Sequence, residues 1–502
     1  MLATTAAAYE QLVEHARAAY VLSSASAILA WDQETGMPRG GGELRSRQLE
    51  ELARLTHMRH SDPRIGEWLQ SCEHDAALQA DPDRAANLRG FRRDYDRATK
   101  LPASLVAELA RHESKAQQIW SESRTASDFA TFRPALQRMI ELQRLKADCL
   151  RGAHSRWDAL ADTCEPGMNA ASLAALFAPL RDRLVCLRQE LDARKRKPDD
   201  RFSRQPFSES AQEEVCRAAL VAMGFDFGRG RLDRSAHPFC TGSVGDVRLT
   251  TRYAKDNVLD ALGSAMHEGG HGLYEQGLNE VNMGTPLGEA ASLGIHESQS
   301  RLWENHVGKS RAFWHWALPM LRQKLGVEVD GWSPDDLWRT CNRVEPSLIR
   351  VEADELTYDL HIMVRFEIER ALLDGALAVV DLPAAWNLRY KELLGIDVPD
   401  DRRGCLQDVH WSCGLFGYFP TYTLGNLYAA QFAAAAARAI PDLEEHQARG
   451  DFAPLLDWLR HHVHRHGRRH EPRELCRLAT GSELSSQPFL SYLESKLRAV
   501  YA

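Results

Sequence analysis

The segment His267-Glu268-Gly269-Gly270-His271 constrains this chain more than any other feature of its sequence. It continues the helix-forming run Ala261-Leu262-Gly263-Ser264-Ala265-Met266. Residues four apart lie on one face of a helix, so both imidazoles can reach one tetrahedral metal ion. The carboxylate between them then lies beside a metal-bound water. The segment predicts a helix that carries His267 and His271 as metal ligands and Glu268 as a general base.

Glycines crowd this predicted helix. A helix interior disfavours each glycine by roughly 1 kcal/mol relative to alanine, yet Gly269, Gly270 and Gly272 lie within four positions. We expect a compensation in which the missing side chains let substrate or a neighbouring segment approach the metal closely.

A catalytic zinc site needs a third protein ligand and one open position for water. The downstream candidates are Glu275, Glu280, Glu289, Glu297 and Glu304. We favour Glu297, which lies 26 residues after His271 in a second predicted helix. A helix-loop-helix return of that length can bring a carboxylate back to the metal, and Arg301 at i+4 could orient it. Glu289 is the fallback ligand.

A histidine cluster near the C-terminus also suggests metal chemistry. Its members are His461, His462, His464, His466 and His470. No carboxylate lies between the two histidines spaced four apart, and Arg465, Arg468 and Arg469 would repel a cation. We therefore predict a surface helix end here, without a metal.

Most of the chain shows helical periodicity, which predicts a mainly α fold. With 502 residues it exceeds the usual size of a single core, so we expect two lobes around a deep active-site cleft. Residues 245–253 alternate apolar and polar side chains after a turn signal and predict a strand or hairpin beside the metal helix. We treat residues 1–502 as one catalytic domain, with a possible lobe boundary near 195–207.

Charge and composition narrow the class of protein. A net charge of −8 argues against a nucleic-acid partner, and the basic run 194–197 fits a solvated linker. The ten cysteines form no CxxC pairs, which favours reduced thiols. The sequence shows no secretion signal and no apolar stretch long enough for a membrane span. We expect a cytoplasmic protein with no membrane partner.

Several motifs together resemble a known family. They are Trp31-Asp32-Gln33-Glu34-Thr35, His237-Pro238-Phe239, Asp246-Val247-Arg248-Leu249-Thr250, the segment His267 to His271, His296-Glu297-Ser298-Gln299, Ile349-Arg350-Val351-Glu352-Ala353-Asp354 and Gly404-Cys405-Leu406-Gln407-Asp408-Val409-His410-Trp411. This set resembles the carboxypeptidase Taq family, also called thermostable carboxypeptidase 1. The resemblance implies a helical, cleft-bearing homodimer that removes single residues from peptide C-termini with broad specificity.

The resemblance also implies roles for particular residues. His267, His271 and Glu297 would be the metal ligands, Glu268 the general base, and Arg350 a group that recognises the substrate carboxylate. Members of the family use zinc or cobalt, so we expect one Zn²⁺ per chain, with Co²⁺ as the alternative.

The chemistry of a carboxypeptidase requires a cation for the free C-terminal carboxylate, and the planar fork of arginine suits that group. Arg350 and Arg248 are the candidates. The alternative role for Arg350 is an ion pair with Asp354 on a helix face. The candidate donors to the tetrahedral oxyanion are Tyr418, Tyr422, His410 and His237. Each of these could equally be a core or cleft-wall residue.

Two rival functions stay open from the residues alone. A metalloendopeptidase or oligopeptidase would use the same ligands without a carboxylate clamp. A helical interaction scaffold would hold a structural metal or none, but structural zinc normally has four protein ligands, whereas this pattern supplies three and a base.

Overall fold

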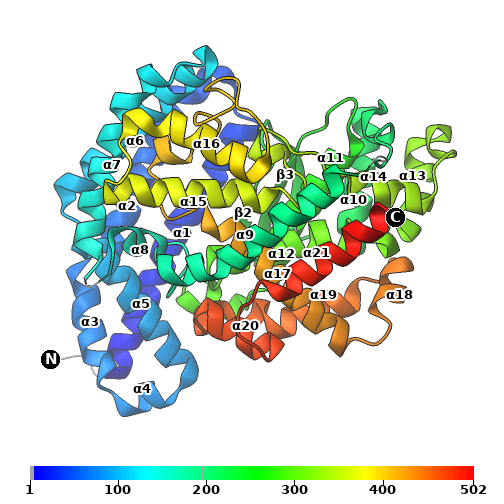
Figure 1. Cartoon of the computed structure of the whole chain (residues 1–502). Helices are drawn as coiled ribbons and strands as arrows, with labels where there is room; N and C mark the ends of the chain where they lie inside the picture. Colours follow the sequence, from blue (N-terminus) through cyan, green and yellow to red (C-terminus); the bar gives the residue numbers. More distant parts are fainter. Residues whose placement is uncertain (1–4, 153, 195–196) are drawn as a thin grey trace. The chain divides into compact units, whose positions relative to one another are not determined.

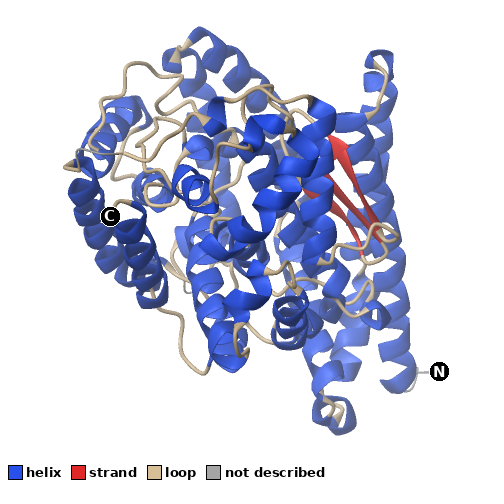
Figure 2. Ribbon diagram, turned by 90° about the vertical axis from the view of Figure 1, so that its right-hand side faces the viewer, coloured by secondary structure: helices blue, strands red, loops and turns tan. Residues whose placement is uncertain are grey.

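Helices dominate the structure, a computed structural model that describes residues 5–152, 154–194 and 197–502 (Figures 1 and 2). The prediction of a mainly α fold with a small sheet is confirmed. The chain divides into two compact units. It passes from the second unit to the first between Pro198 and Asp199. Residues 195 and 196, part of the predicted basic linker and lobe boundary, lie outside the described residues.

Unit 1 comprises residues 1–99, 199–341 and 428–484. Its helices are α1 (Thr5–Thr35), α2 (Gly42–His60), α3 (Pro63–Glu73), α4 (Ala76–Ala80), α5 (Pro82–Lys100), α10 (Glu209–Met223), α11 (Val258–Gly277), α12 (Leu293–Arg301), α13 (Arg311–Leu325), α14 (Pro334–Cys341), α18 (Leu443–Ala448), α19 (Ala453–His462) and α20 (Pro472–Thr480). Its strands are β1 (Gly230–Arg234), β2 (Cys240–Ser243) and β3 (Asp246–Thr251).

Unit 2 comprises residues 100–198, 342–427 and 485–502. Its helices are α6 (Ala103–Ala126), α7 (Phe129–Leu150), α8 (Arg156–Ala161), α9 (Ala170–Asp192), α15 (Tyr358–Asp374), α16 (Leu382–Leu394) and α21 (Gln487–Val500). Helix α17 (Pro420–Ala439) begins in unit 2 and continues into unit 1.

Short turns of 3-10 helix connect many of these elements. They lie at Arg39–Gly41, Phe202–Arg204, Glu280–Asn282, Pro286–Gly288, Val327–Val329, Arg350–Glu352, Val379–Asp381, His410–Cys413 and His464–Arg469.

The sheet of unit 1 has the strand order β1-β3-β2. Strand β3 coincides with the predicted strand at 245–253, and it pairs antiparallel with β2 and parallel with β1. Val244 and Gly245 form the two-residue loop of the β2–β3 hairpin, and Gly245 has a positive φ of 93°, which glycine adopts without steric cost. Strands β2 and β3 pack against α11, so the sheet lies beside the helix that carries His267 and His271. Figure 2 shows the three strands packed among helices.

Helix α11 begins at a conventional N-cap. The side chain of Asn257 accepts a hydrogen bond from the backbone N–H of Asp260 at 3.1 Å, which satisfies one of the donors left open at a helix start. Its buried face is apolar and includes Ala261, Leu262 and Ala265. The cap and the apolar face together offset the poor helix propensity of the glycines that follow.

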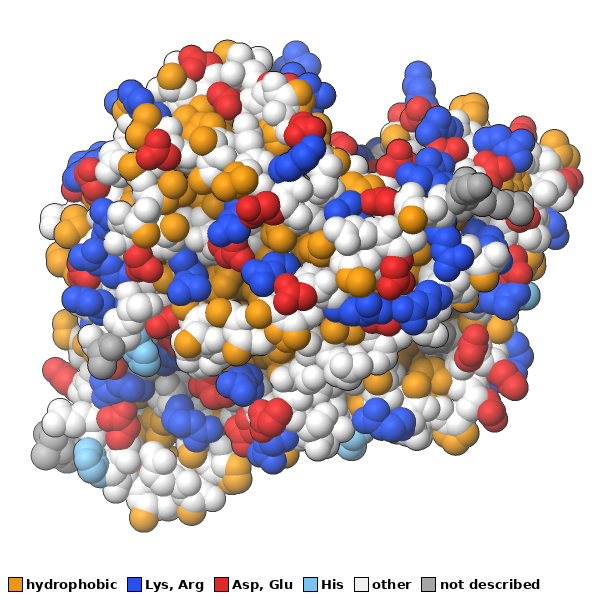
Figure 3. Space-filling view, in the orientation of Figure 1, with side chains coloured by type: hydrophobic (Ala, Val, Ile, Leu, Met, Phe, Trp, Pro, Cys, Tyr) orange, Lys and Arg blue, Asp and Glu red, His pale blue; other side chains and the backbone are white. Residues whose placement is uncertain are grey.

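Charged side chains of both signs are intermixed on the face shown in Figure 3. Exposed ion pairs within one helix recur along the chain; Arg54 and Glu51 of α2 form one of them. Exposed pairs of this kind contribute at most about 1 kcal/mol each, so the fold depends on its buried residues. Among the described residues, no helix combines the length and the apolarity needed to cross a membrane.

We predict that Asn257→Ala destabilises unit 1 by about 1 kcal/mol, because the substitution removes the N-cap of α11. Asn257→Asp is the matched control, since aspartate caps a helix as well as asparagine does. The midpoint of urea unfolding, followed in metal-free protein, measures both. Equal midpoints for Asn257→Ala and the parent chain would contradict the role of the cap.

Candidate metal centre

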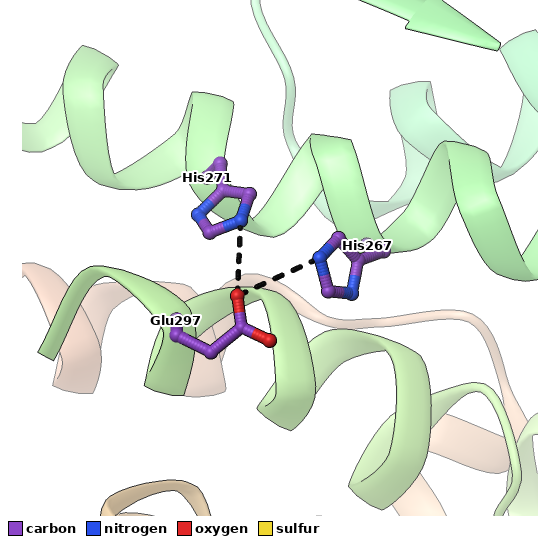
Figure 4. A group of neighbouring side chains, drawn as sticks. All are labelled: His267, His271 and Glu297. Atoms are coloured by element: carbon purple, nitrogen blue, oxygen red, sulfur yellow. Dashed lines mark ion pairs between the residues drawn. The ribbon is translucent and has the colours of Figure 1, made fainter. Parts of the chain in front are cut away.

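The three predicted ligands lie where α11 faces α12 (Figure 4). His267 and His271 project from successive turns of α11, and Glu297 projects from α12. Glu297 Oε2 lies 3.7 Å from His267 Nε2 and 3.4 Å from His271 Nε2. Within the described ranges, they form a group whose potential ligand atoms all lie within 4.8 Å of one another.

These spacings fit a single ion. Ligand atoms about 2.1 Å from a tetrahedral ion are about 3.4 Å apart, close to the two measured distances. Two imidazole nitrogens and one carboxylate oxygen are also the donor types that catalytic divalent metals use, with a fourth position left for water.

Outer carboxylates orient both histidines. His267 Nδ1 is hydrogen-bonded to Glu304 Oε2 at 2.9 Å. His271 Nδ1 lies 2.5 Å from His296 Nδ1, and His296 Nε2 is bonded to Glu275 Oε1 at 2.9 Å. Each ligand ring therefore has its Nδ1 held from behind, which turns its Nε2 toward Glu297. Such outer bonds fix the ring and its tautomer.

Glu297 is held on both oxygens. Arg301 Nε donates to Oε1 at 2.7 Å, and Ser300 Oγ donates to Oε2 at 3.2 Å. Burial opposes ionisation of this carboxyl group, but Arg301 and the two histidines hold its pKa below the usual range. The interaction with Arg301 agrees with the i+4 spacing noted in the sequence, and it keeps Glu297 an anion, the form that binds a metal.

The two histidines differ in their protonation. Burial lowers the pKa of His271 to about 3, so this imidazole is neutral at physiological pH and available as a ligand. Burial also opposes protonation of His267, but the nearby charges of Glu297 and Glu304 raise its pKa. The pKa values of the two candidate ligands are therefore shifted in opposite directions.

Glu268 lies between the two ligands and is 7% exposed. Burial raises the pKa of this carboxyl group to about 7, while the neighbouring charge of His267 acts to lower it. A carboxyl group with a pKa near neutrality can accept a proton and return it at physiological pH.

The glycines of α11 admit neighbouring segments, one of the two possibilities expected from the sequence. A Cβ added at Gly270 would meet the backbone of α12, at the carbonyl oxygen of Gln299 and at 2.6 Å from the Cα of Ser300. Only a residue without a side chain lets α12 pass this close to α11. Gly270 therefore sets the approach that brings Glu297 between His267 and His271.

The remaining glutamates lie elsewhere. Glu304 lies in a π-helical segment, Leu302–Val307, that follows α12 directly and widens the turn behind His267. Glu275 bonds His296, and Glu280 is exposed. Glu289, the fallback ligand, is bonded to Arg468 and lines a cavity of about 310 Å³. The sequence did not show that Glu304 lies behind His267, because the π-helical turn is a local irregularity that spacing does not reveal.

The C-terminal histidines do not gather around a point. His464 is fully buried and bonded to Gln299 at 2.8 Å, whereas His461 and His466 are exposed or half-buried. The group of three ligands described above is the metal-binding arrangement found among the described residues. Helix α19 ends at His462, and His464 in the following turn is turned into the core; the absence of a metal from this cluster stays a prediction.

Two candidate substrate residues, Arg248 and His237, lie in unit 1, in or beside the sheet that packs against α11. Arg248, on β3, is bonded through two nitrogens to Asp246 at 2.9 Å and lies over the ring of Trp31 at 4.3 Å. His237 is exposed in the connection before β2. Arg248 is thus held by its own strand and by α1.

The other candidates gather in unit 2. Arg350 is 5% exposed and donates to Asp408 through Nε at 3.1 Å and Nη2 at 2.9 Å. The guanidinium carbon lies 4.9 Å from the ring centre of Tyr422. His410 is bonded to Tyr422 at 3.2 Å, and its ring contacts that of Tyr418. The structure therefore brings four of the candidates together.

The alternative role for Arg350 is wrong. Asp354 accepts hydrogen bonds from the backbone and the hydroxyl of Thr357, while Arg350 pairs with Asp408, which is 58 residues away in the sequence. Arg350 lies in a 3-10 turn, where the helical i+4 relation does not apply.

Two histidines one helical turn apart, a carboxylate from a second helix and a buried glutamate between the histidines are the groups that a metallopeptidase uses. The chain belongs to the carboxypeptidase Taq (M32) metallopeptidase family, whose model matches residues 11–497. The resemblance seen in the motifs is confirmed, and the chain is a peptide hydrolase, a carboxypeptidase that depends on a divalent metal. The endopeptidase alternative is not favoured.

The relatives match along nearly the whole length. Thermostable carboxypeptidase 1 of Thermus thermophilus is 46% identical, covering 99% of this chain and 100% of its own. Carboxypeptidase 1 of Bacillus subtilis is 38% identical over 95% of this chain and 96% of its own. Among solved structures, the M32 carboxypeptidase from Deinococcus radiodurans has a TM-score of 0.96 at 41% identity, with 98% and 99% of the two chains covered.

We predict that Gly270→Ala weakens divalent metal binding by at least about tenfold, because the added methyl group displaces α12 and Glu297 with it. Gly263→Ala is the matched control on the same helix, since a Cβ there meets nothing within 4 Å. That control should keep its affinity and gain up to about 1 kcal/mol of stability. Competition with a chromophoric chelator measures both affinities, and equal values would contradict the role of Gly270.

Proposed function

We propose that this carboxypeptidase is a zinc enzyme that binds one ion per chain through His267, His271 and Glu297. The observation that carries the proposal is the position of Glu297 Oε2, which is 3.7 Å and 3.4 Å from the two histidine Nε2 atoms. A set of two histidines and one glutamate with an open fourth position is typical of catalytic zinc. Co²⁺ accepts the same ligands and is the alternative metal.

The proposed mechanism assigns proton transfer to Glu268. A bound zinc ion supplies a Lewis acid for the scissile carbonyl and lowers the pKa of a water molecule to about 7. Glu268 takes the proton of the attacking water and then delivers it to the amine of the departing residue. Glu304 and His296 keep the ligand rings in orientation while this proton moves.

We propose Arg350 as the group that recognises the terminal carboxylate of the peptide. Its hydrogen bonds to Asp408 and to the hydroxyl of Tyr358 use three of its five N–H groups. Asp408 keeps the planar group in one orientation, and a fixed fork suits bidentate carboxylate binding. Arg248 is the second candidate. Tyr418, Tyr422, His410 and His237 stay candidates for the donor to the tetrahedral oxyanion.

The specificity and assembly also stay proposals. Recognition of a carboxylate common to all peptides is compatible with broad specificity and removal of one residue at a time. The homodimer is a prediction from family resemblance, and light scattering of the purified chain tests it. The cytoplasmic location is a prediction from the sequence, and cell fractionation tests it.

We predict that Glu268→Gln lowers kcat by about 10²- to 10⁴-fold, the usual contribution of a general base. The glutamine has nearly the shape of glutamate but accepts no proton. The release of free amino acid from an unblocked peptide measures the rate, and metal analysis of the same sample checks that the site is loaded. Full activity in metal-loaded Glu268→Gln would contradict the proposed mechanism.

We predict that Arg350→Lys lowers kcat/KM for an unblocked peptide by about 10- to 100-fold, since lysine keeps the charge but loses the bidentate fork. Arg248→Lys, measured in parallel, separates the two candidate arginines. A C-terminally amidated peptide provides the second comparison, because the parent enzyme should cleave it poorly. The proposal for Arg350 fails if only Arg248→Lys reduces the preference for the free carboxylate.

A further inference from the structure

One face of α15 carries a row of fully buried polar side chains. His361, Arg365 and Glu369 follow one another at intervals of four residues, and each has 0% relative exposure. Residues at this spacing lie one above the other on a helix. Helix α15 therefore presents a polar row to the interior of unit 2, where apolar residues would be expected.

Arg365 holds Asp408, the carboxylate that pairs with Arg350. It donates to Asp408 through Nε at 2.7 Å and to Gln407 through Nη2 at 2.8 Å. Asp408 in turn accepts from Arg350. A positive charge on α15 thus fixes the carboxylate that orients Arg350.

Glu369 has a different set of partners, all of them uncharged N–H donors. Its Oε1 accepts from the indole of Trp157 at 2.9 Å and from the backbone of Gly417 at 2.6 Å. Its Oε2 accepts from the indole of Trp411 at 2.9 Å. The three donors come from α8, from the loop after the 3-10 turn His410–Cys413, and from that turn itself.

Burying the carboxyl group of Glu369 costs free energy that an apolar side chain would not. Burial raises the pKa of Glu369 to about 7, and the three donors only partly offset this. An apolar residue of similar size would fill the volume without burying a carboxyl group. What the carboxyl group adds is direction, because it ties three separate segments to one helix at fixed distances.

Two of the three bonds end next to proposed substrate residues. Trp411 directly follows His410, and Gly417 directly precedes Tyr418. Gly417 has a φ of +76°, and an added Cβ would meet the backbone of Ala161. The chain at Gly417 is therefore confined between α8 and Glu369. One carboxyl group holds both ends of the segment 411–417.

We propose that Glu369 is a positioning residue for substrate binding: it sets the places of His410 and Tyr418 around Arg350. The inference rests on the proposed function, in which this group contacts the peptide. Glu369 touches no substrate; it acts through the two anchors of the loop.

Glu369→Gln tests the inference with a minimal change of shape. A glutamine has one acceptor oxygen, so its NH₂ group must face either Trp411 or the pair of Trp157 and Gly417. In both orientations at least one of the two loop anchors is lost. We expect KM for an unblocked peptide to rise about five- to tenfold, the effect of one buried hydrogen bond, while metal content is unchanged; a fall in kcat beside the rise in KM would identify His410 or Tyr418 as the oxyanion donor.

Two tryptophan variants separate positioning from a general loss of structure. Trp411→Phe removes the bond beside His410, and Trp157→Phe removes the bond that leads to α8. Both delete one indole donor from the same carboxylate, so both should lower the thermal midpoint. We expect only Trp411→Phe to raise KM. Equal KM changes in the two tryptophan variants would overturn the inference. This comparison decides the matter even if Glu369→Gln fails to fold.

Arg350→Lys, assayed beside these variants, distinguishes the inference from the proposed function. If Arg350→Lys raises KM and neither Glu369→Gln nor Trp411→Phe does, the positioning role is refuted and the role of Arg350 stands. If the latter two raise KM and Arg350→Lys does not, the role of Arg350 is refuted and the positioning of His410 and Tyr418 is supported. Unchanged KM in all three variants refutes both.

Discussion

The close contact of α11 with α12 at Gly270 is the constraint on which the metal site depends. The spacing of two histidines on one helix is fixed by local sequence, but the carboxylate comes from another helix. Its distance from the histidines is decided by how near the two backbones come. The backbone of α12 lies where a side chain at Gly270 would be. Glycine at this position lowers the local helix propensity, but it allows Glu297 Oε2 to lie 3.4 Å from His271 Nε2.

Charge supplies the second constraint on the site. Four carboxyl groups surround the histidines: Glu268, Glu275, Glu297 and Glu304. Two cations contact them, Arg301 on Glu297 and Glu304, and Lys309 on Glu304. More carboxyl groups than cationic side chains therefore contact one another around the candidate ligands, so a bound metal cation adds positive charge where acidic groups gather.

The sequence was sufficient for elements with local signatures. Helical periodicity predicted the mainly α fold, the alternation at 245–253 predicted β3, and a helix-loop-helix return predicted that Glu297 could reach the histidines. It did not show the π-helical turn that places Glu304 behind His267, nor the parallel pairing of β1 with β3. Both depend on packing between segments whose partners have no local pattern.

The pairing of Arg350 shows the same limit. The IRxxAD motif offered Asp354 as a neighbour, but the true partner, Asp408, belongs to a motif 58 residues later. The motif that contains Arg350 and the motif that contains Asp408 are therefore joined by one ion pair, although they are separate in the sequence. The residues that join them to the fold, Arg365 and Glu369, lie in α15 outside every motif quoted for the family resemblance. Positioning residues are hard to find from a sequence because their own chemistry is not used in the reaction.

The polar row of α15 has a further physical consequence for recognition. Arg365 and Glu369 are part of a helix whose other buried residues, such as Leu360 and Phe366, belong to the core. A shift of the loop 404–418 would break buried hydrogen bonds that water could not replace. The loop is therefore ordered when unit 2 folds. Substrate binding does not have to order it, so the free energy of binding is not reduced by that loss of entropy. A small ligand group such as a carboxylate, which offers few contacts, is bound well only by residues that are already in place.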